Sequence, residues 1–480
     1  MTLKILITLA LLVLAGTGWY HSSKALPAGI SYRGQTAPLV APQLLTDTTL
    51  HYQDGSEVLE QEIFDEALRL IAQAKDFILV DMFLYNSSRP EGVPFRPLAR
   101  QLTQALIARK QARPELQIIV ISDPINTLYG GTTSPWFEQL KQADIQVLET
   151  HLPALRDSNP AWSAIWRLCC QWLGNNPEGG WLPNVIGDQP VTLRSYLALP
   201  NFKANHRKLL VVDKGQELRA LVTSANPHDG SSRHSNIGLA FSGPAVTDLL
   251  VSERAVMVLS GADTGVIDRW ITRSRDTLPG QPVAGEIQVL TESAIRNRAL
   301  AMIDSANAGD QLDLAMFYLS HRKTVAALIR AAHRGTRLRV LLDANFDAFG
   351  HTKKGIPNRQ VAMELQRAGI PVRWCNTRGE QCHSKLLILR REGNNSQILL
   401  GSANFTRRNL DDLNLETSVW VSLPEDAPET EKAVTFFDRY WQSGPDQDPV
   451  MSLPYADRAD ESRFRYWRYR IMEATGLSTF

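Results

Sequence analysis

The sequence predicts an α/β fold in which two similar domains pack as a pseudo-twofold, bilobal unit. Apolar, strand-like segments alternate with segments of helical period along the chain, a pattern typical of layered α/β domains with a mixed or mainly parallel sheet. The same series of segments also occurs twice in the same order, which indicates an internal repeat. With 480 residues, 44% of them hydrophobic, the chain is long enough to bury two cores.

The N-terminal segment, residues 1–25, is predicted to be a signal peptide or a membrane anchor. One positive charge, at Lys4, precedes an almost unbroken apolar run over residues 5–18. A bilayer crossing needs about 20 apolar residues, which this run reaches if the two aromatic residues that follow it lie at the interface. Cleavage after Ala15 or Ala25 is the alternative. In either case we expect an exported or inner-membrane-anchored protein that faces the periplasm or the cell exterior.

The repeat defines the two domains, which we place at residues 46–275 and 286–445. In chain order, the matching strand-like segments are 77–86 with 311–320, 116–123 with 338–345, 143–149 with 368–374, 206–213 with 383–390, and 222–226 with 400–404. Helical periodicity is clear at 62–75 and 324–335. A Pro- and Gly-containing stretch at 274–286 is the predicted linker, and a basic, aromatic tail follows at 446–480.

An insert interrupts the repeat in the first domain at about residues 150–200. Val147 and His206 are 59 positions apart, whereas the corresponding spacing before His383 is 11. The insert is rich in tryptophan, and Trp162, Trp166, Cys169 and Leu173 would share one face of a helix. Two interpretations are open: a helix packed on its own domain, or a lid or entry wall that touches a membrane surface.

The most specific pattern lies where the fourth matched segment begins. His206 and Lys208 head an apolar strand, and side chains two positions apart share a face, whereas Asp213 lies on the opposite face. A turn at 214–215 then returns the chain as a hairpin, which would bring Asn226 close to His206. The second domain repeats this arrangement with His383, Lys385 and Asn404.

Two His-x-Lys motifs, each followed by Ser-Ala-Asn, resemble those of the phospholipase D superfamily, and the resemblance covers residues 55–445. It implies one active site between the lobes, with His206 as the nucleophile and His383 as the acid and base. It also implies that Glu416 orients a catalytic imidazole. Ser224 and Ser402 belong to the same motif, as does Asp213.

The residue types suit phosphodiester chemistry. One neutral imidazole attacks phosphorus to form a phosphohistidine, and the other, protonated, gives its proton to the departing alcohol. The two lysines and two asparagines would bind the phosphoryl oxygens, so no metal or other cofactor is implied. The four cysteines, at 169, 170, 375 and 382, are too few and too poorly spaced for a zinc site or a disulfide framework, although Cys375 and Cys382 are either bridged or free thiols.

The second motif departs from the first in two places. Arg390 stands where the first has Asp213, which we interpret as a structural strand-end group. Alignment of residues 413–417 with 235–239 places Gly238 opposite Glu416. Only one histidine would then have a carboxylate partner, unless Asp81 or Asp313 substitutes, and the sequence leaves open which histidine Glu416 serves.

The expected substrate is a phospholipid at a membrane surface, and the protein is expected to act as a monomer. Length and paired motifs resemble those of bacterial cardiolipin synthases, while phospholipases D share the same phosphatidyl-enzyme step, so transfer and hydrolysis both stay open. A nuclease is the alternative, because residues 463–470 interleave arginines with aromatic rings, although the net charge of +1 makes nucleic acid an unlikely partner. A non-catalytic binding module is the third.

Overall fold

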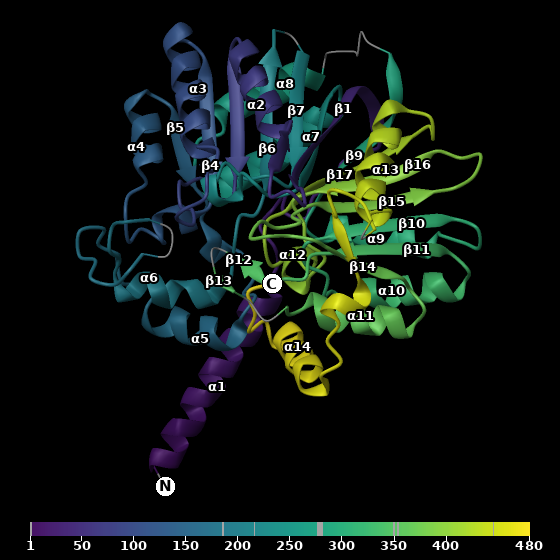
Figure 1. The fold of residues 1–480 in the computed structure, drawn as a ribbon. Coiled ribbons are helices and arrows are strands. Elements are labelled where there is room, and N and C mark those ends of the chain that lie inside the picture. The colour runs from purple at the N-terminus through teal and green to yellow at the C-terminus, as the bar shows by residue number, and fades with distance from the viewer. Residues whose placement is uncertain are drawn as a thin grey trace.

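One mixed sheet runs through both halves of the protein. The structure is a computed structural model that describes residues 2–184, 187–215, 217–275, 282–348, 351–352, 355–444 and 446–480. Its sheet has 16 strands, in the order β18-β14-β11-β10-β15-β16-β17-β9-β1-β8-β7-β6-β3-β4-β5, with β2 paired to β1 (Figure 1). The first eight strands are β1 (Ala37–His51), β2 (Glu57–Gln61), β3 (Phe77–Met82), β4 (Gln117–Ser122), β5 (Gln146–Glu149), β6 (Lys208–Lys214), β7 (Glu217–Thr223) and β8 (Asn236–Ser242).

The strands of the second half follow the same order as those of the first. They are β9 (Val283–Thr291), β10 (Gln311–Met316), β11 (Arg337–Leu342), β14 (Val372–Cys375), β15 (Lys385–Arg390), β16 (Ser396–Gly401), β17 (Thr417–Leu423) and β18 (Ser452–Pro454), with a separate two-stranded ladder of β12 (Asp347–Ala348) and β13 (His351–Thr352). β1 and β9 pair antiparallel at the middle of the sheet, so the halves share a backbone ladder.

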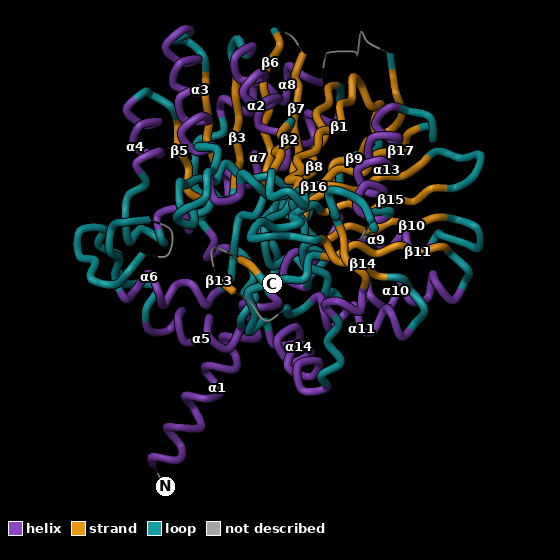
Figure 2. The backbone as a smooth tube through the Cα atoms, viewed as in Figure 1, coloured by secondary structure: helices purple, strands orange, loops and turns teal. Residues whose placement is uncertain are grey.

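Helices cover the sheet along its length (Figure 2). They are α2 (Ile63–Gln73), α3 (Leu98–Ala112), α4 (Pro135–Gln142), α7 (Ala245–Leu259), α8 (Gly265–Arg275), α9 (Ser293–Asp304), α10 (Arg322–His333), α11 (Asn358–Arg367) and α13 (Pro428–Trp441). Two further helices pack on these, α12 (Arg407–Leu410) on α9 and α14 (Arg463–Thr475) on α11. The predicted α/β class with a mixed sheet is confirmed. The repeated strand order is what a duplicated domain would give, while the domain boundaries stay a prediction, and the middle of the predicted linker, 276–281, lies outside the described residues.

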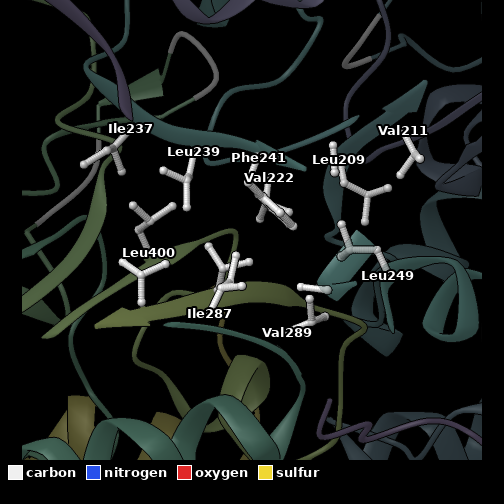
Figure 3. Close-up of a cluster of buried hydrophobic side chains, with 14 of the residues drawn as sticks. Leu209, Val211, Val222, Ile237, Leu239, Phe241, Leu249, Ile287, Val289 and Leu400 are labelled. Atoms are coloured by element: carbon white, nitrogen blue, oxygen red, sulfur yellow. The ribbon is translucent and has the colours of Figure 1, made fainter. Parts of the chain in front are cut away.

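An apolar core between the two halves holds them together. Figure 3 shows Leu239 and Phe241 of β8 facing Ile287 of β9 and Leu400 of β16, and all four side chains are buried. Complete burial of one such side chain contributes about 1.5–3 kcal/mol. Because this core contains side chains from both halves, it fixes the position of one histidine motif relative to the other.

The N-terminal helix α1 (Thr2–Ser23) projects from the body of the protein (Figure 1). Its stretch Leu3–Ser23 has a mean hydropathy of 1.7 and is 6% buried, so by length and composition it is able to cross a membrane. A signal sequence near the N-terminus has the same length and composition. Its last turns pack on the insert. Gly18 lies so close to Pro160 that a Cβ at position 18 would be 3.2 Å from the Pro160 backbone oxygen. The His21 carbonyl also accepts a hydrogen bond of 2.9 Å from the Asp157 amide.

The insert contains the helices α5 (Pro160–Cys169) and α6 (Leu193–Ala198). The residues of the predicted helix face differ in their packing. Trp166 is buried, and the Trp162 indole donates to the Leu197 carbonyl at 3.0 Å. Leu173, by contrast, is exposed. The predicted four-residue face is therefore wrong at Leu173, because α5 ends at Cys169 and the chain turns away before that residue.

Candidate active site

The two histidine motifs lie where the strands β6 and β15 begin. Lys208 opens β6 opposite Met82, the last residue of the antiparallel strand β3. Lys385 opens β15 opposite Met316, the last residue of β10. Each motif therefore lies at an end of its half-sheet, where loops rather than strand partners surround the polar groups.

Glu416 serves His206, which the sequence left open. His206 Nδ1 is 2.9 Å from Oε1 and 3.0 Å from Oε2 of Glu416, and the carboxylate is buried. The His206 amide also donates to the Leu415 carbonyl at 2.8 Å. The second half of the chain thus supplies both supports of the histidine in the first half.

Asn236 takes the corresponding place beside His383. Its Oδ1 is 3.1 Å from His383 Nδ1, and the His383 amide donates to the Ser235 carbonyl at 2.8 Å. Neither carboxylate suggested as a substitute contacts this imidazole: Asp81 accepts two hydrogen bonds from Asn205, and Asp313 pairs with Arg339.

The expected alignment of Gly238 with Glu416 is wrong by two residues. Thr223 pairs with Gly238 between β7 and β8, and Gly401 pairs with Ser418 between β16 and β17. Counting back from these pairs places Asn236 opposite Glu416 in the repeat. The sequence similarity misled because the loop that follows Asn404 is two residues longer than the loop that follows Asn226.

Ser224 and Ser402 hold the partners of the two imidazoles. Ser224 Oγ donates to Asn236 Oδ1 at 2.9 Å and accepts from the Ile237 amide at 3.1 Å. Ser402 Oγ donates to the Glu416 carboxylate and accepts from the Thr417 amide. The serines of the two Ser-Ala-Asn elements are therefore equivalent in position and in hydrogen bonding.

Both lysines are buried and fold back onto their own motifs. Lys208 Nζ donates to the His206 carbonyl at 2.7 Å, and Lys385 Nζ donates to the His383 carbonyl at 2.6 Å. Burial lowers the pKa of Lys208 to about 7. Burial, followed by the charge of Lys208, lowers the pKa of Lys385 well below its usual range. An anionic ligand would favour the charged form of both amines and raise their pKa values.

Two phenylalanines that sequence reasoning missed lie over the motifs. The Phe83 ring is 4.7 Å from the His206 ring and 5.1 Å from Lys208 Nζ. Phe317 repeats the arrangement with His383 at 5.1 Å and Lys385 at 5.3 Å. The signal was present in the sequence, because both residues follow a methionine at the same place in the first matched segment.

The two sets share one electrostatic environment. Burial lowers the pKa of His206 to about 4, against the opposing effect of Glu416, and the charge of Lys385 adds to the lowering. Burial, Lys385, His234, Lys208 and His206 together lower the pKa of His383. Burial raises the pKa of Glu416, but the contact with His206, the charge of Lys208 and the hydrogen bond from Ser402 leave it below its usual value. Both imidazoles are therefore neutral at neutral pH, and Glu416 is ionised.

A third imidazole, that of His234, lies beside His383. The sequence contained no signal for it, because it is not part of the repeated motifs. Its ring is 5.8 Å from the His383 ring. Nδ1 accepts a hydrogen bond of 3.2 Å from the Gln381 amide, so the neutral ring carries its proton on Nε2. Burial lowers the pKa of His234 to about 3.

The asparagines of the two sets differ in how they are satisfied. Asn226 Oδ1 accepts a hydrogen bond of 3.3 Å from the Leu84 amide. Asn404 Oδ1 is buried and has no partner among the described residues. A buried polar atom without a partner costs about 1–3 kcal/mol, so a ligand that donates a hydrogen bond to Asn404 Oδ1 would be favoured.

Asp213 lies away from the histidines. Its Oδ1 accepts hydrogen bonds from the amides of Lys75, Asp76 and Phe77, at 2.9, 2.8 and 2.9 Å. It thereby fixes the start of β3. Arg390, at the same place in the second half, instead reaches Asp313 at 3.4 Å.

Cys375 and Cys382 form a disulfide beside the second motif. Their Cα atoms are 6.2 Å apart, and Cys382 directly precedes His383. Cys169 and Cys170 are also bonded, so the expectation that the cysteines form no disulfide framework is wrong. Among the described residues, no group of three or more His, Cys, Asp or Glu is arranged to hold a metal ion.

The model of the family described as "Cardiolipin synthase, PLD-like domain" matches residues 299–441, which include the second His-x-Lys motif. The fold is similar to that of phosphatidylserine synthase from Haemophilus influenzae, with a TM-score of 0.55, 12% identity, and coverage of 92% of this chain and 96% of that one. The second half of the chain is therefore similar to the phospholipase D-like domain of that family, and the whole chain is similar in fold to the synthase. No curated protein matches the sequence.

Two other solved structures are less similar to this chain. Polyphosphate kinase from Porphyromonas gingivalis has a TM-score of 0.46 and 13% identity over 91% of this chain, which spans only 53% of the kinase. Nuc from Salmonella typhimurium, a phospholipase D family member, has a TM-score of 0.26 and 21% identity over 34% of this chain and 97% of Nuc.

Proposed function

We propose that the protein is a phosphodiesterase or phosphatidyltransferase that acts on phospholipids through a phosphohistidine. The observation that carries the proposal is that each half of the chain supplies the hydrogen-bond partner of the histidine in the other half. Each histidine donates its Nδ1 proton to an oxygen from the other half, Glu416 for His206 and Asn236 for His383. Both rings therefore carry an available lone pair on Nε2, as a nucleophile and a base require.

The difference between the two partners supports His206 as the nucleophile and His383 as the acid and base. His206 Nε2 attacks phosphorus and forms a P–N bond, and the Glu416 carboxylate stabilises the positive charge that the ring acquires. The bond from phosphorus to the leaving oxygen breaks. His383, which takes up a proton on Nε2 when the bound phosphodiester anion raises its pKa, transfers that proton to the leaving oxygen. Because Asn236 is neutral, it does not hold this proton as a carboxylate would, which favours proton donation.

The second step reverses the first. Neutral His383 takes a proton from water or from an acceptor alcohol, whose oxygen attacks phosphorus and releases His206. Lys208, Lys385 and the amides of Asn226 and Asn404 would bind the phosphoryl oxygens in both steps. Water as the acceptor gives phospholipase D hydrolysis, and a phosphatidylglycerol hydroxyl gives cardiolipin synthase-like transfer.

Two observations support a phospholipid as the substrate. The helix α1 is long and apolar enough to cross a membrane, and a membrane anchor would keep the site close to lipid. The fold is also similar to that of an enzyme named for phosphatidylserine synthesis.

The test is turnover of labelled phosphatidylglycerol, phosphatidylcholine and single-stranded DNA by the full chain with a chelator present. Cardiolipin with released glycerol identifies the transferase, and released choline or phosphatidic acid identifies the hydrolase. Rapid quenching in a neutral detergent denaturant, which spares the acid-labile P–N bond, should also trap labelled phosphatidyl on the protein, and His206→Ala should abolish the label. Loss of DNA alone would support the nuclease, and no turnover would support a binding module; either result would overturn the proposal.

A further inference from the structure

The helix α14 presents its most apolar side chains to solvent. Phe464, Trp467 and Ile471 are 78%, 62% and 60% exposed, and their spacing puts them on one face. The opposite face holds buried Tyr469 and Glu473. A helix that packs only for stability would turn this apolar face inward, so the outward face requires a partner.

The insert exposes a second apolar group. Trp172, Trp181 and Leu173 are 76%, 69% and 61% exposed, and Ile165 and Leu168 of α5 are also exposed. Outside α1, the exposed Trp and Phe side chains of the described residues all lie in these two segments. Isolated exposed apolar residues are normal, whereas their concentration marks an interaction surface.

Direct contacts join the two segments to the base of α1. The Asp157 amide bonds to the His21 carbonyl of α1. The next residue, Ser158, lies against Gly476, the C-cap of α14. Figure 1 accordingly shows α1, α5 and α14 on one side of the molecule. The two segments that carry the apolar groups thus lie next to the end of α1 at which a membrane-crossing helix would leave the bilayer.

We propose that these side chains form a docking face that lies on the surface of the bilayer in which α1 is anchored. The docking face consists of Ile165, Leu168, Trp172, Leu173, Trp181, Phe464, Trp467 and Ile471. Aromatic rings are favoured at the boundary between head groups and acyl chains. The exposed arginines Arg463 and Arg468 of α14 flank that face and would attract anionic head groups.

Docking would place the active site at the lipid surface. The insert leads directly into His206, and Ser158 Oγ bonds to the Phe202 carbonyl at 2.6 Å. Glu473 of α14 bonds to Ser320 Oγ at 2.7 Å and to the Arg407 amide, three residues after Asn404. The inference rests on the proposed function, since it names the surface on which the substrate is reached, but lipid contact is measurable without turnover.

The experiment is tryptophan quenching in the full chain, reconstituted in vesicles that contain phosphatidylglycerol and lipids brominated near the head group. Trp172→Phe and Trp467→Phe should each remove part of the quenched fluorescence, because bromine quenches at contact. Trp374→Phe removes a fully buried indole and is the matched control. Quenching that is unchanged by both variants would overturn the docking face, and so would a Trp467 response to single-stranded DNA but not to vesicles.

A second measurement separates docking from catalysis. The pair Phe464→Ser and Trp467→Ser should lower turnover of vesicle phospholipid by about tenfold, the effect of losing part of the buried aromatic area, and leave turnover of a soluble short-chain phospholipid unchanged. Equal loss on both substrates would overturn the docking face. Normal quenching without any phospholipid turnover would instead overturn the proposed function and leave the docking face intact.

Discussion

His206 and Glu416 are 210 positions apart in the chain, yet His206 Nδ1 lies 2.9 Å from a Glu416 carboxylate oxygen. His383 and Asn236 make the reciprocal contact at 3.1 Å. Each half of the chain therefore completes the histidine of the other half. The reactivity of one motif depends on side chains that its own half does not contain.

Glu416→Gln should lower turnover by up to about 10⁴-fold, the loss found when the carboxylate that orients a catalytic imidazole becomes an amide. The amide no longer stabilises positive charge on His206, so the labelled phosphohistidine should also accumulate more slowly in rapid-quench experiments. Glu364→Gln, which removes a carboxylate paired with Arg322, is the control and should keep near-normal turnover. Equal rates for the two variants would refute the role of Glu416.

Asn236→Asp should move the alkaline limb of the kcat/KM profile to higher pH. A carboxylate beside His383 stabilises the imidazolium and raises the pKa of His383, so the protonated acid persists at higher pH. The profile is measured on a soluble phosphodiester, with Asn307→Asp on an exposed loop as the control. An alkaline limb that stays in place would show that His383 is not the acid.

Binding of inorganic phosphate at a pH of about 8 should take up protons. Burial lowers the pKa of Lys208 to about 7, so this amine is mostly neutral at that pH, and a bound anion raises the pKa by favouring the ammonium form. Calorimetry in buffers of different ionisation enthalpy measures the uptake. Lys208→Arg stays charged throughout and should take up fewer protons, and an unchanged uptake would contradict the lysine assignment.

Arg207→Leu should destabilise the fold by about 3–5 kcal/mol, because it leaves buried carboxylates without their partner. Arg207 is fully buried and pairs with Glu253 at 2.7 Å and Glu292 at 2.9 Å. Arg330→Leu removes a half-exposed pair with Asp304 and should cost no more than about 1 kcal/mol. Urea unfolding followed by circular dichroism compares the two, and equal midpoints would show that the buried network adds no stability.

The sequence was informative wherever a pattern was local. Strand alternation placed His206 and Lys208 together and Asp213 elsewhere, and the repeat supplied the fold class. The partner of each imidazole was not predictable, because it comes from the other half and because a loop two residues longer hides the equivalence of Asn236 and Glu416. His234 has no equivalent in the repeat to mark it.

The cysteine pairing and the burial of the tryptophans also could not be predicted from a local sequence pattern. Whether Cys375 and Cys382 bond is decided by the distance between the end of β14 and the start of β15, which only the folded chain sets. Likewise, Trp166 and Trp172 have the same chemistry, but the end of α5 between them makes one a core residue and the other a surface residue.

Because each histidine takes its hydrogen-bond partner from the other half, the two repeated motifs can come to differ in their chemical roles. If each repeat tuned its own histidine, a change that specialised one copy would alter a self-contained unit. Here position 236 contacts the ring at 383, and a substitution there leaves the ring at 206 with its own carboxylate. Two identical motifs can thus drift into unequal chemical tasks without a change in either motif.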